Sequence, residues 1–238
     1  MNPTKKKRTK PEPLPKYYKE TEHLFEIGID EAGRGPLFGR VYVAGVVLPK
    51  HMDTTEIRDS KKLTKSKLQT LYAHIRKNAV VFHIAFVEAV EIDEINIREA
   101  VLKGMHECAR ECITALSLLP KDETHSDTFF LCVDGNDFPP YYHNNANTCI
   151  PYETFTGGDN RYASIAAASI LAKVARDDYI RELCLEFPKL SELYGMDKHM
   201  GYGTKQHMEA ILQYGITDLH RKTFGTCKGK PICQLEID

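Results

Sequence analysis

The sequence predicts an α/β protein with a mixed sheet and a helical C-terminal part. Apolar runs of strand length come first, and segments with a helical spacing of apolar residues then alternate with further strands. Such alternation is typical of α/β folds. Of the 238 residues, 42% are hydrophobic and 27% are charged, so the chain can bury a core without disulfide bonds or structural metals.

Four segments have the composition of strands. Residues 25–30 read FEIGID and stop at a glycine-rich stretch, whereas residues 41–48 are apolar almost throughout, as expected for a strand covered on both faces. Residues 80–87 and 129–133 are the third and fourth predicted strands.

Helices are predicted between and after these strands. Residues 68–75 carry apolar side chains at i, i+3, i+4 and i+7, and Thr64 is a suitable N-cap for that helix. A longer helix is expected over residues 93–118. Another is expected over residues 162–185, whose alanine- and serine-rich start allows close packing on a sheet. The last predicted helix covers residues 204–214.

The N-terminal residues 1–20 are rich in proline and lysine and lack apolar periodicity, which predicts a disordered basic tail. Within it, Lys5–Lys10 reads KKKRTK, which fits a nuclear address, a weak nucleic-acid tether or a plain solubilising tail. The formal net charge of the chain is −1, so only local basic surfaces, here and in residues 198–230, favour a nucleic-acid partner.

Cysteine usage and hydropathy indicate the compartment. The seven cysteines are odd in number and include no CxxC motif, which is typical of buried apolar residues in a reducing environment. No apolar run approaches the length of a membrane span, and the N-terminus lacks the apolar core of a signal peptide. We therefore expect an intracellular, cytoplasmic protein without a membrane partner.

Four acidic residues stand at the ends of predicted elements. Asp30 and Glu31 end the first strand, Asp134 ends the fourth, and Asp159 precedes the small-residue helix. If these strands are neighbours, the carboxylates converge on one edge of the sheet, where their repulsion requires a cation. Oxygen ligands favour Mg²⁺ or Mn²⁺.

Two such ions can clamp a phosphodiester, so no side-chain nucleophile is needed. The sequence offers neither a Gly-x-Ser-x-Gly motif nor a Cys/His signature for one. Successive side chains of a strand point to opposite faces. We therefore expect the strand to break at residues 32–36 and to turn Glu31 towards Asp30.

The glycine loop GRGPLFG, residues 33–39, does not have the spacing of a dinucleotide loop, and an apolar strand follows it where a helix would be needed. Glycines allow close approach of the backbone to a nucleic acid, whose ribose 2′-OH exposed peptide groups can read. Arg34 would contact a phosphate. A tight turn with an exposed arginine is the alternative.

These segments resemble the ribonuclease HII family, type 2 ribonuclease H. The matching segments are GIDEAGRGPLFG (28–39), DSKKLT (59–64), IDEINI (92–97), VDGN (133–136), ASIAAASILAKVARD (163–177), HMGYGT (199–204) and HRKTFG (220–225). They occur in the family's order from about residue 25 to residue 225, and seven motifs in register are far more specific than one.

The resemblance implies an RNase H-like mixed β-sheet flanked by helices in a catalytic core of residues 21–190. A helical, substrate-binding C-terminal extension would follow in residues 191–238. It implies a monomer that uses Mg²⁺ or Mn²⁺ to cut the RNA of RNA–DNA hybrids, and to nick ribonucleotide-containing DNA on the 5′ side of the ribonucleotide. The products would carry 3′-OH and 5′-phosphate ends. The sister type, ribonuclease HIII, has a further N-terminal domain, for which residues 1–24 are too few and too polar.

The resemblance also implies roles for individual residues. Asp30, Glu31 and Asp134 look like metal ligands, and Asp159 resembles a fourth catalytic acid. Gly33, Arg34 and Gly35 resemble the loop that recognises the RNA–DNA junction. Tyr202 resembles a tyrosine that packs on the sugar after the ribonucleotide. Residues that resemble phosphate contacts are Lys61, Asn96, Ser169 and Lys173.

Two departures from the family pattern each remove a cation near the substrate. Gly157 stands where members commonly have the Lys of Lys-Gly-Asp, and Met200 stands where they commonly have the Lys of His-Lys-Gly-Tyr. Two other functions remain open. One is another two-metal nuclease of the same fold, such as a junction resolvase or integrase, and the other is a non-catalytic hybrid-binding module. The glycine loop and Tyr202 favour 2′-OH recognition.

Overall fold

The computed structural model describes residues 12–19, 24–120, 128–143 and 149–233. A five-stranded sheet lies at its centre in the order β3-β2-β1-β4-β5. The strands are β1 (Leu24–Ala32), β2 (Val41–Val47), β3 (Val81–Val87), β4 (Thr128–Asp134) and β5 (Tyr152–Phe155). β1 pairs antiparallel with β2 and parallel with β4, so the predicted mixed sheet is confirmed.

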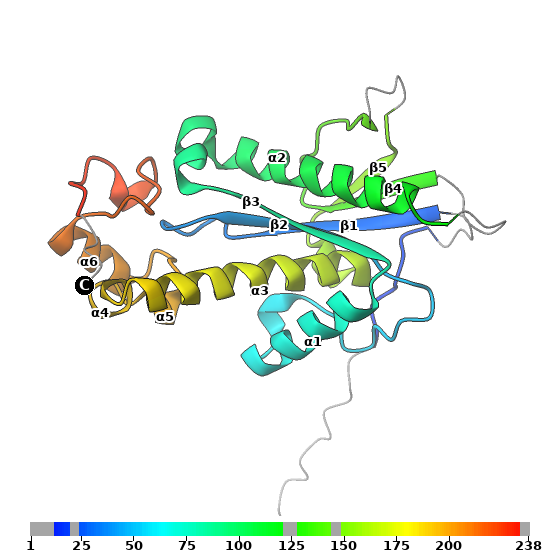
Figure 1. The fold of residues 1–238 in the computed structure, drawn as a ribbon, viewed down its shortest axis with the longest axis horizontal. Coiled ribbons are helices and arrows are strands. Elements are labelled where there is room, and N and C mark those ends of the chain that lie inside the picture. The colour runs from blue at the N-terminus through cyan, green and yellow to red at the C-terminus, as the bar shows by residue number, and fades with distance from the viewer. Residues whose placement is uncertain (1–11, 20–23, 121–127, 144–148, 234–238) are drawn as a thin grey trace, which may run out of the picture.

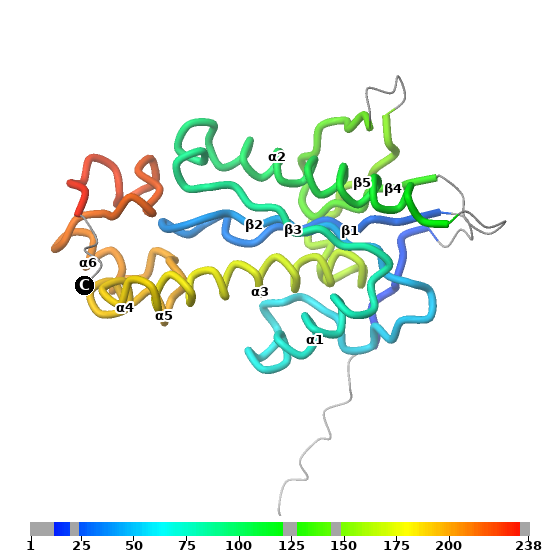
Figure 2. The backbone as a smooth tube through the Cα atoms, viewed as in Figure 1, coloured from blue at the N-terminus to red at the C-terminus, as the bar shows by residue number. Residues whose placement is uncertain are grey.

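Helices cover both faces of this sheet, with α2 on one side and α1 and α3 on the other (Figure 1). The helices are α1 (Lys65–Asn78), α2 (Ala89–Ser117), α3 (Ala163–Glu186), α4 (Lys189–Glu192), α5 (Met196–His199) and α6 (Lys205–Tyr214). The last three and a 3₁₀ turn at Gly225–Cys227 gather at one end of the sheet (Figure 2), which confirms the helical C-terminal part. None of the helices in the described part of the chain combines the length and the apolar character that crossing a bilayer needs.

The small residues of α3 bring this helix close to β1. A Cβ atom added to Gly28 would lie 2.3 Å from the backbone carbonyl carbon of Ser164. Ala163 to Ala172 are buried almost without interruption, because this part of α3 lies beneath the sheet. This packing fixes α3 against the strand that carries the first acidic residues.

The structure differs from the sequence-based expectations at several elements. β5 was not predicted, because its four residues include the polar Glu153 and Thr154 and it is half exposed. α2 begins at Ala89, four residues before the expected start, and is kinked at Asn96, whose φ of 69° is not helical. The short helices α4 and α5 were also not predicted.

The expected disordered tail of residues 1–20 differs from the structure over residues 12–19, which pack on the core. The Tyr17 hydroxyl donates to the Leu48 carbonyl at 2.8 Å, and the Ala163 amide donates to the Pro15 carbonyl at 2.8 Å. The buried carboxylate of Glu26 accepts hydrogen bonds from the backbone amides of Tyr18 and Lys19. The basic stretch Lys5–Lys10 lies outside the described residues.

Candidate active site

Three carboxylates meet where β1 and β4 end. Ile29 is paired with Val133 in the parallel register, so Asp30 and Asp134 follow at the same level of adjacent strands. Asp30, Glu31 and Asp134 each offer one carboxylate oxygen, and these oxygens lie within 4.8 Å of one another. The structure thus brings together the three predicted metal ligands.

Glu31 reaches this cluster from within the strand. β1 ends at Ala32 and residues 33–36 lie outside it, so the expected break is present. The break does not turn Glu31, however, because Glu31 is still paired with Val43 of β2. β4 ends at Asp134, which leaves the edge of β1 beside Glu31 without a neighbouring strand. This open edge gives the longer Glu31 side chain room to approach Asp30 from the other face.

Asp30 is buried, and α3 holds its side chain. Ser169 of α3 donates a hydrogen bond to the Asp30 carboxylate, and the Ser169 hydroxyl lies 3.0 Å from that of Ser60. Burial raises the pKa of Asp30 well above its ordinary value, and the charges of Glu31 and Asp134 raise it further. An ionised Asp30 is therefore unfavourable unless a cation compensates it.

Asp134 and Asp159 are connected by the turn before α3. The Gly158 amide donates to Asp134 Oδ1 at 2.6 Å, which places the Gly158–Asn160 turn against the end of β4. Asp159 lies outside the cluster of three, and the Asn160 amide group donates to it at 2.8 Å. Burial raises the pKa of Asp159, and the charges of Asp59 and Asp134 add to that effect.

Lys61 lies beside these acids in a 3₁₀ turn, Ser60–Lys62. Asp59 caps this turn by accepting from the Lys61 amide at 2.9 Å, and Asn160 donates to Asp59 at 3.3 Å. Burial alone would lower the pKa of Lys61, but the carboxylates of Asp159, Asp59, Asp30 and Asp134 together raise it. Lys61 is thus a positively charged group close to these acids, in addition to Arg34, which lies 3.5 Å from Glu31.

The chemistry of the cluster fits a hard divalent cation. All its donors are carboxylate oxygens, the ligands that Mg²⁺ and Mn²⁺ prefer, and each has a raised pKa, first of all because of burial. A divalent ion would compensate the mutual repulsion of these carboxylates, whose pKa values stay raised although Lys61 and Arg34 lie nearby. Asp30, Glu31 and Asp134 are the residues that would hold it.

The glycine loop is held in shape by a buried arginine from the C-terminal segment. Arg221 is fully buried, and its guanidinium donates to the carbonyls of Gly33 at 2.7 Å, Pro36 at 2.9 Å and Gly39 at 2.9 Å. A fourth bond reaches the Arg34 carbonyl at 3.1 Å. Burial lowers the pKa of Arg221 to about 9, with the Arg176 charge as a second cause.

Arg176 of α3 lies between the glycine loop and Tyr202. A Cβ atom on Gly33 would lie 2.3 Å from Arg176 Nε, and the Arg176 guanidinium carbon is 5.6 Å from the centroid of the Tyr202 ring. Arg176 donates to the Met200 carbonyl at 2.9 Å, whereas its Nε and Nη1 have no hydrogen-bond partner among the described residues. The two predicted recognition elements therefore share one buried cation.

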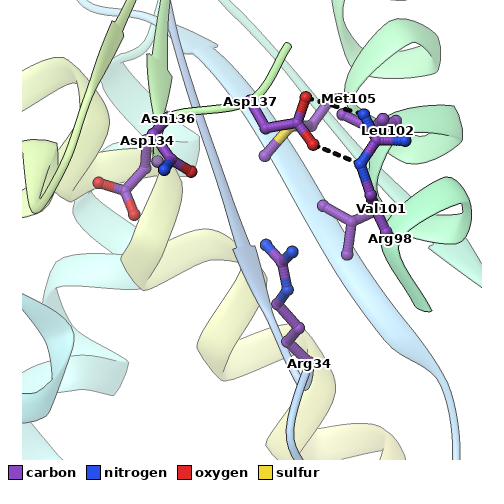
Figure 3. A pocket seen from close by; sticks show the side chains of 9 residues that line it. Arg34, Arg98, Val101, Leu102, Met105, Asp134, Asn136 and Asp137 are labelled. Carbon is purple, nitrogen blue, oxygen red and sulfur yellow. Dashed lines mark hydrogen bonds and ion pairs between the residues drawn. The ribbon is translucent and has the colours of Figure 1, made fainter.

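Arg34 and α2 border a small hollow next to Asp134 (Figure 3). The Arg34 guanidinium points into the space between Asp134 and Arg98, and it lies 3.5 Å from Glu31. Arg98 on the far side is paired with Asp137 at 2.5 and 2.9 Å. The side chain of Arg34 is 53% exposed, so it is accessible to a ligand at the acidic edge.

The other predicted phosphate contacts have different surroundings. Ser169 is buried and its hydroxyl is engaged by Asp30 and Ser60, so a contact with phosphate would require those bonds to be exchanged. Lys173 of α3 is half-buried and donates to Asp177 at 2.6 Å. Asn96 is exposed at the kink of α2, where its side-chain oxygen accepts from two backbone amides.

Sequence reasoning missed the residues that support the recognition elements. Arg176, Arg221, His207 and His220 are all buried, although arginine and histidine are not typical of protein cores. Three of them stand in segments that carry the family resemblance, ASIAAASILAKVARD and HRKTFG. The position of these residues within the family motifs was the available signal, but their partners become visible only in three dimensions.

Comparison with known proteins identifies the family. The sequence profile of the family described as Ribonuclease HII matches residues 27–227. Ribonuclease HII of Francisella tularensis subsp. novicida is 42% identical over 198 residues, covering 83% of this chain and 95% of the relative. Ribonuclease HII of Parabacteroides distasonis is also 42% identical, over 87% of this chain and 92% of the relative.

Solved structures share the fold. The ribonuclease HII in the PCNA complex from Archaeoglobus fulgidus has a TM-score of 0.61 at 24% identity, covering 84% of this chain and 95% of that one. The Mn²⁺ complex of Bst-RNase HIII has a TM-score of 0.58 at 17% identity, covering 87% of this chain and 69% of that one. The matching profile, the two relatives and the convergent carboxylates together show that the chain belongs to the ribonuclease HII family and is a divalent-metal-dependent ribonuclease H that cleaves RNA–DNA hybrids.

Proposed function

We propose that this ribonuclease H also nicks duplex DNA on the 5′ side of a single embedded ribonucleotide, leaving 3′-OH and 5′-phosphate ends, by a two-metal-ion mechanism. The observation that carries the proposal is the approach of three carboxylates to within 4.8 Å of one another beside the glycine loop. Arg34 connects the carboxylates to the glycine loop, because it belongs to the loop and lies 3.5 Å from Glu31.

The acids would hold the metal. Asp30, Glu31 and Asp134 are assigned as ligands of one Mg²⁺ or Mn²⁺ ion, and Asp159 is assigned with Asp134 to a second. When bound, such ions lower the pKa of an attacking water and stabilise the leaving oxygen. Ser169, Ser60 and the Gly158 amide orient Asp30 and Asp134, so the carboxylates are fixed before a cation arrives. The Mn²⁺ complex of Bst-RNase HIII supports a hard divalent ion.

The substrate would be read by the loop and by Tyr202. A Cβ atom on Gly35 would have no heavy atom within 4 Å, so the backbone there is open to a ribose. Tyr202 is 43% exposed and offers a ring face to the following sugar. Lys61, Lys173 and Asn96 are assigned to the phosphates around the scissile bond, and Ser169 acts there through Asp30. The monomeric state stays a prediction.

A nicking assay tests this function. A labelled DNA duplex with one ribonucleotide is incubated with Mg²⁺ or Mn²⁺, with and without EDTA, and the product ends are mapped. We expect one nick 5′ of the ribonucleotide, no cut in an all-DNA duplex and no cut in EDTA. Asp134→Asn should lose activity by about a thousand-fold or more, because a metal ligand is removed.

The control variant is Asp218→Asn, since the Asp218 side chain is 74% exposed and is ion-paired with the surface residue Lys222, away from the acidic cluster. It should keep wild-type activity. Wild-type rates for Asp134→Asn would overturn the assigned site, and cutting of branched all-DNA substrates would favour a nuclease of another specificity.

A further inference from the structure

A buried chain of hydrogen bonds ends at the backbone of Tyr202. The Thr217 amide donates to His220 Nδ1 at 2.9 Å, and His220 Nε2 lies 3.1 Å from His207 Nε2. His207 Nδ1 in turn lies 3.0 Å from the Tyr202 carbonyl oxygen. Both histidines are fully buried, yet neither belongs to the acidic site.

The partners at the two ends fix the tautomer of each ring. The Tyr202 carbonyl can only accept, so His207 carries its proton on Nδ1, and its Nε2 is an acceptor. The Thr217 amide can only donate, so His220 Nδ1 is an acceptor, and its proton is on Nε2. All the bonds of the chain are satisfied by one arrangement in which both rings are neutral.

The surroundings keep the rings neutral. Burial lowers the pKa of His207 to about 4, and a positive charge on His199 would lower it further. Burial likewise lowers the pKa of His220 to about 3, and a positive charge on His207 would add to that effect. The His199 ring is stacked on the His207 ring, with 4.8 Å between the ring centroids. The Tyr194 ring packs against the rings of His207 and His220. Among the described residues, no carboxylate is hydrogen-bonded or ion-paired to either histidine. The chain therefore persists at neutral pH.

The pair also connects Tyr202 to the glycine loop. The His220 ring packs edge-on against Phe38 at 5.0 Å, and Phe38 and His220 form an isolated β-bridge. The next residue, Arg221, binds the carbonyls of the loop. A displacement of His220 would thus change the position of Tyr202 relative to Gly33 and Arg34.

We propose that the His207–His220 pair is a positioning element that fixes Tyr202 relative to the glycine loop, and thereby sets the preference for a deoxyribose after the cleaved ribonucleotide. The inference rests on the proposed function, in which Tyr202 contacts that sugar. The pair acts through Tyr202 and touches neither metal nor substrate.

Two substitutions of similar size separate this role from general packing. In His207→Asn, the side-chain amide nitrogen takes the place of Nδ1 and still donates to the Tyr202 carbonyl. In His207→Gln, the amide reaches the place of Nε2, so the bond to Tyr202 is lost. The readout is the ratio of kcat/KM for a duplex with one ribonucleotide to kcat/KM for a uniform RNA–DNA hybrid.

We expect His207→Gln to lower this ratio about five-fold, as for the loss of one hydrogen bond. His207→Asn should restore only part of it, because it keeps the bond to Tyr202 but loses the bond to His220. In a Tyr202→Ala background, which itself lowers the ratio, His207→Gln should have no further effect, because residues that act through one another are not additive. Equal ratios for wild type and His207→Gln, or full additivity with Tyr202→Ala, would overturn the inference.

The outcomes also separate the inference from the proposed function. If wild type does not cut the duplex with one ribonucleotide, the proposed function fails, and the inference fails with it. If wild type cuts but the variants do not change the ratio, the inference alone fails. If the variants do not fold, ¹⁵N-histidine NMR of wild type at pH 7 measures the tautomer of each ring instead. A proton on Nδ1 of His207 and on Nε2 of His220 supports the pair. Any other combination of tautomers contradicts it.

Discussion

Gly33 and Gly35 stand two positions apart in the glycine loop, yet their surroundings differ. Gly33 has a φ of +99°, and a Cβ atom there would lie 2.3 Å from Arg176 Nε, whereas Gly35 has open space around the same position. The first glycine is therefore required by the fold itself. The second leaves open space in front of the backbone, where a ligand has room to approach.

Alanine substitutions separate these two requirements. Gly33→Ala should lower the free energy of unfolding by about 2–3 kcal/mol, because it combines a positive φ with overpacking. Gly35→Ala should change that free energy by less than about 0.5 kcal/mol but reduce kcat/KM on ribonucleotide-containing duplex, since the methyl group would meet the ribose. Urea unfolding and nicking rates measure both, and a stability loss as large for Gly35→Ala as for Gly33→Ala would contradict the distinction.

The Asp134 carboxylate illustrates how a metal site reduces stability when no metal is bound. Burial raises its pKa, so its ionised form at pH 7 is disfavoured in the folded chain. In Asp134→Asn the side-chain oxygen can still accept from the Gly158 amide. We expect this variant to be more stable than wild type in EDTA by about 1 kcal/mol, although it is inactive.

Thermal unfolding in EDTA and in Mg²⁺ tests this expectation. The metal should raise the Tm of wild type more than that of Asp134→Asn, because the variant has lost a ligand. A lower Tm of the variant in EDTA would show that the charge of Asp134 stabilises the fold.

At the scale of elements, the kink in α2 has a local cause. Asn96 has φ 69° and ψ 163°, a region that only glycine adopts without strain, and its Oδ1 accepts from the amides of Arg98 at 2.9 Å and Glu99 at 3.2 Å. Asn96 thus acts as an N-cap within what is otherwise one helix. The kink positions Arg98, which borders the hollow beside Asp134.

Three substitutions at Asn96 should rank in a defined order. Asn96→Ala loses the cap and keeps the strain, so the free energy of unfolding should fall by about 2–3 kcal/mol. Asn96→Gly relieves the strain, so its free energy of unfolding should be lower than that of wild type by about 1 kcal/mol or less. Asn96→Asp keeps the cap oxygen, so its free energy of unfolding should stay near that of wild type. Chemical denaturation gives the order, and equal losses for alanine and glycine would argue against strain at this position.

The elements that were predictable from the sequence are those with a clear apolar or compositional pattern. The first four strands, α1 and most of α2 were expected from apolar runs or apolar spacing, and Thr64 caps α1 as predicted. α3 was expected from its alanine- and serine-rich start, and α6 as the last helix. β5 was not predictable, because its four residues, of which only Phe155 is buried, are too few to show a periodicity that distinguishes a strand from a loop. The kink at Asn96 was equally invisible, since its cause is a backbone angle.

At the scale of the whole molecule, the convergence of Asp30, Glu31 and Asp134 was predicted from their positions at strand ends, and the parallel register of β1 and β4 confirms it. The way in which Glu31 reaches the cluster was not predicted, because it depends on where the neighbouring strand ends. The roles of Arg176, Arg221 and the two histidines depend on contacts between distant segments, which no local pattern reveals. Metal stoichiometry and ribonucleotide nicking stay predictions.

The buried histidines also make stability depend on pH. An unfolded histidine binds a proton near pH 6.5, whereas the pKa of His207 in the folded chain is about 4 and that of His220 is about 3. As the pH falls below 6.5, the unfolded chain binds protons that the folded chain does not, so the pair's contribution to stability decreases until the folded pKa values are reached.

Relative to wild type, His207→Gln should therefore show a smaller loss of stability between pH 7 and pH 5, by about 1–2 kcal/mol. Guanidinium unfolding in EDTA at both pH values measures the difference. Because both proteins have the same carboxylates, the titration of the carboxylates cancels in this comparison. Identical pH dependence of the two proteins would mean that His207 is not held neutral in the folded chain.

The order of the strands has a consequence for translation. β1, β2 and β3 are consecutive and antiparallel, so they can pair soon after they leave the ribosome, whereas β4 must insert beside β1 much later. A nascent chain without β4 carries Asp30 and Glu31 but not Asp134. Arg221, which binds the carbonyls of the glycine loop, is synthesised later still. We therefore expect the acidic site and the glycine loop to be complete only after residue 221 has been synthesised.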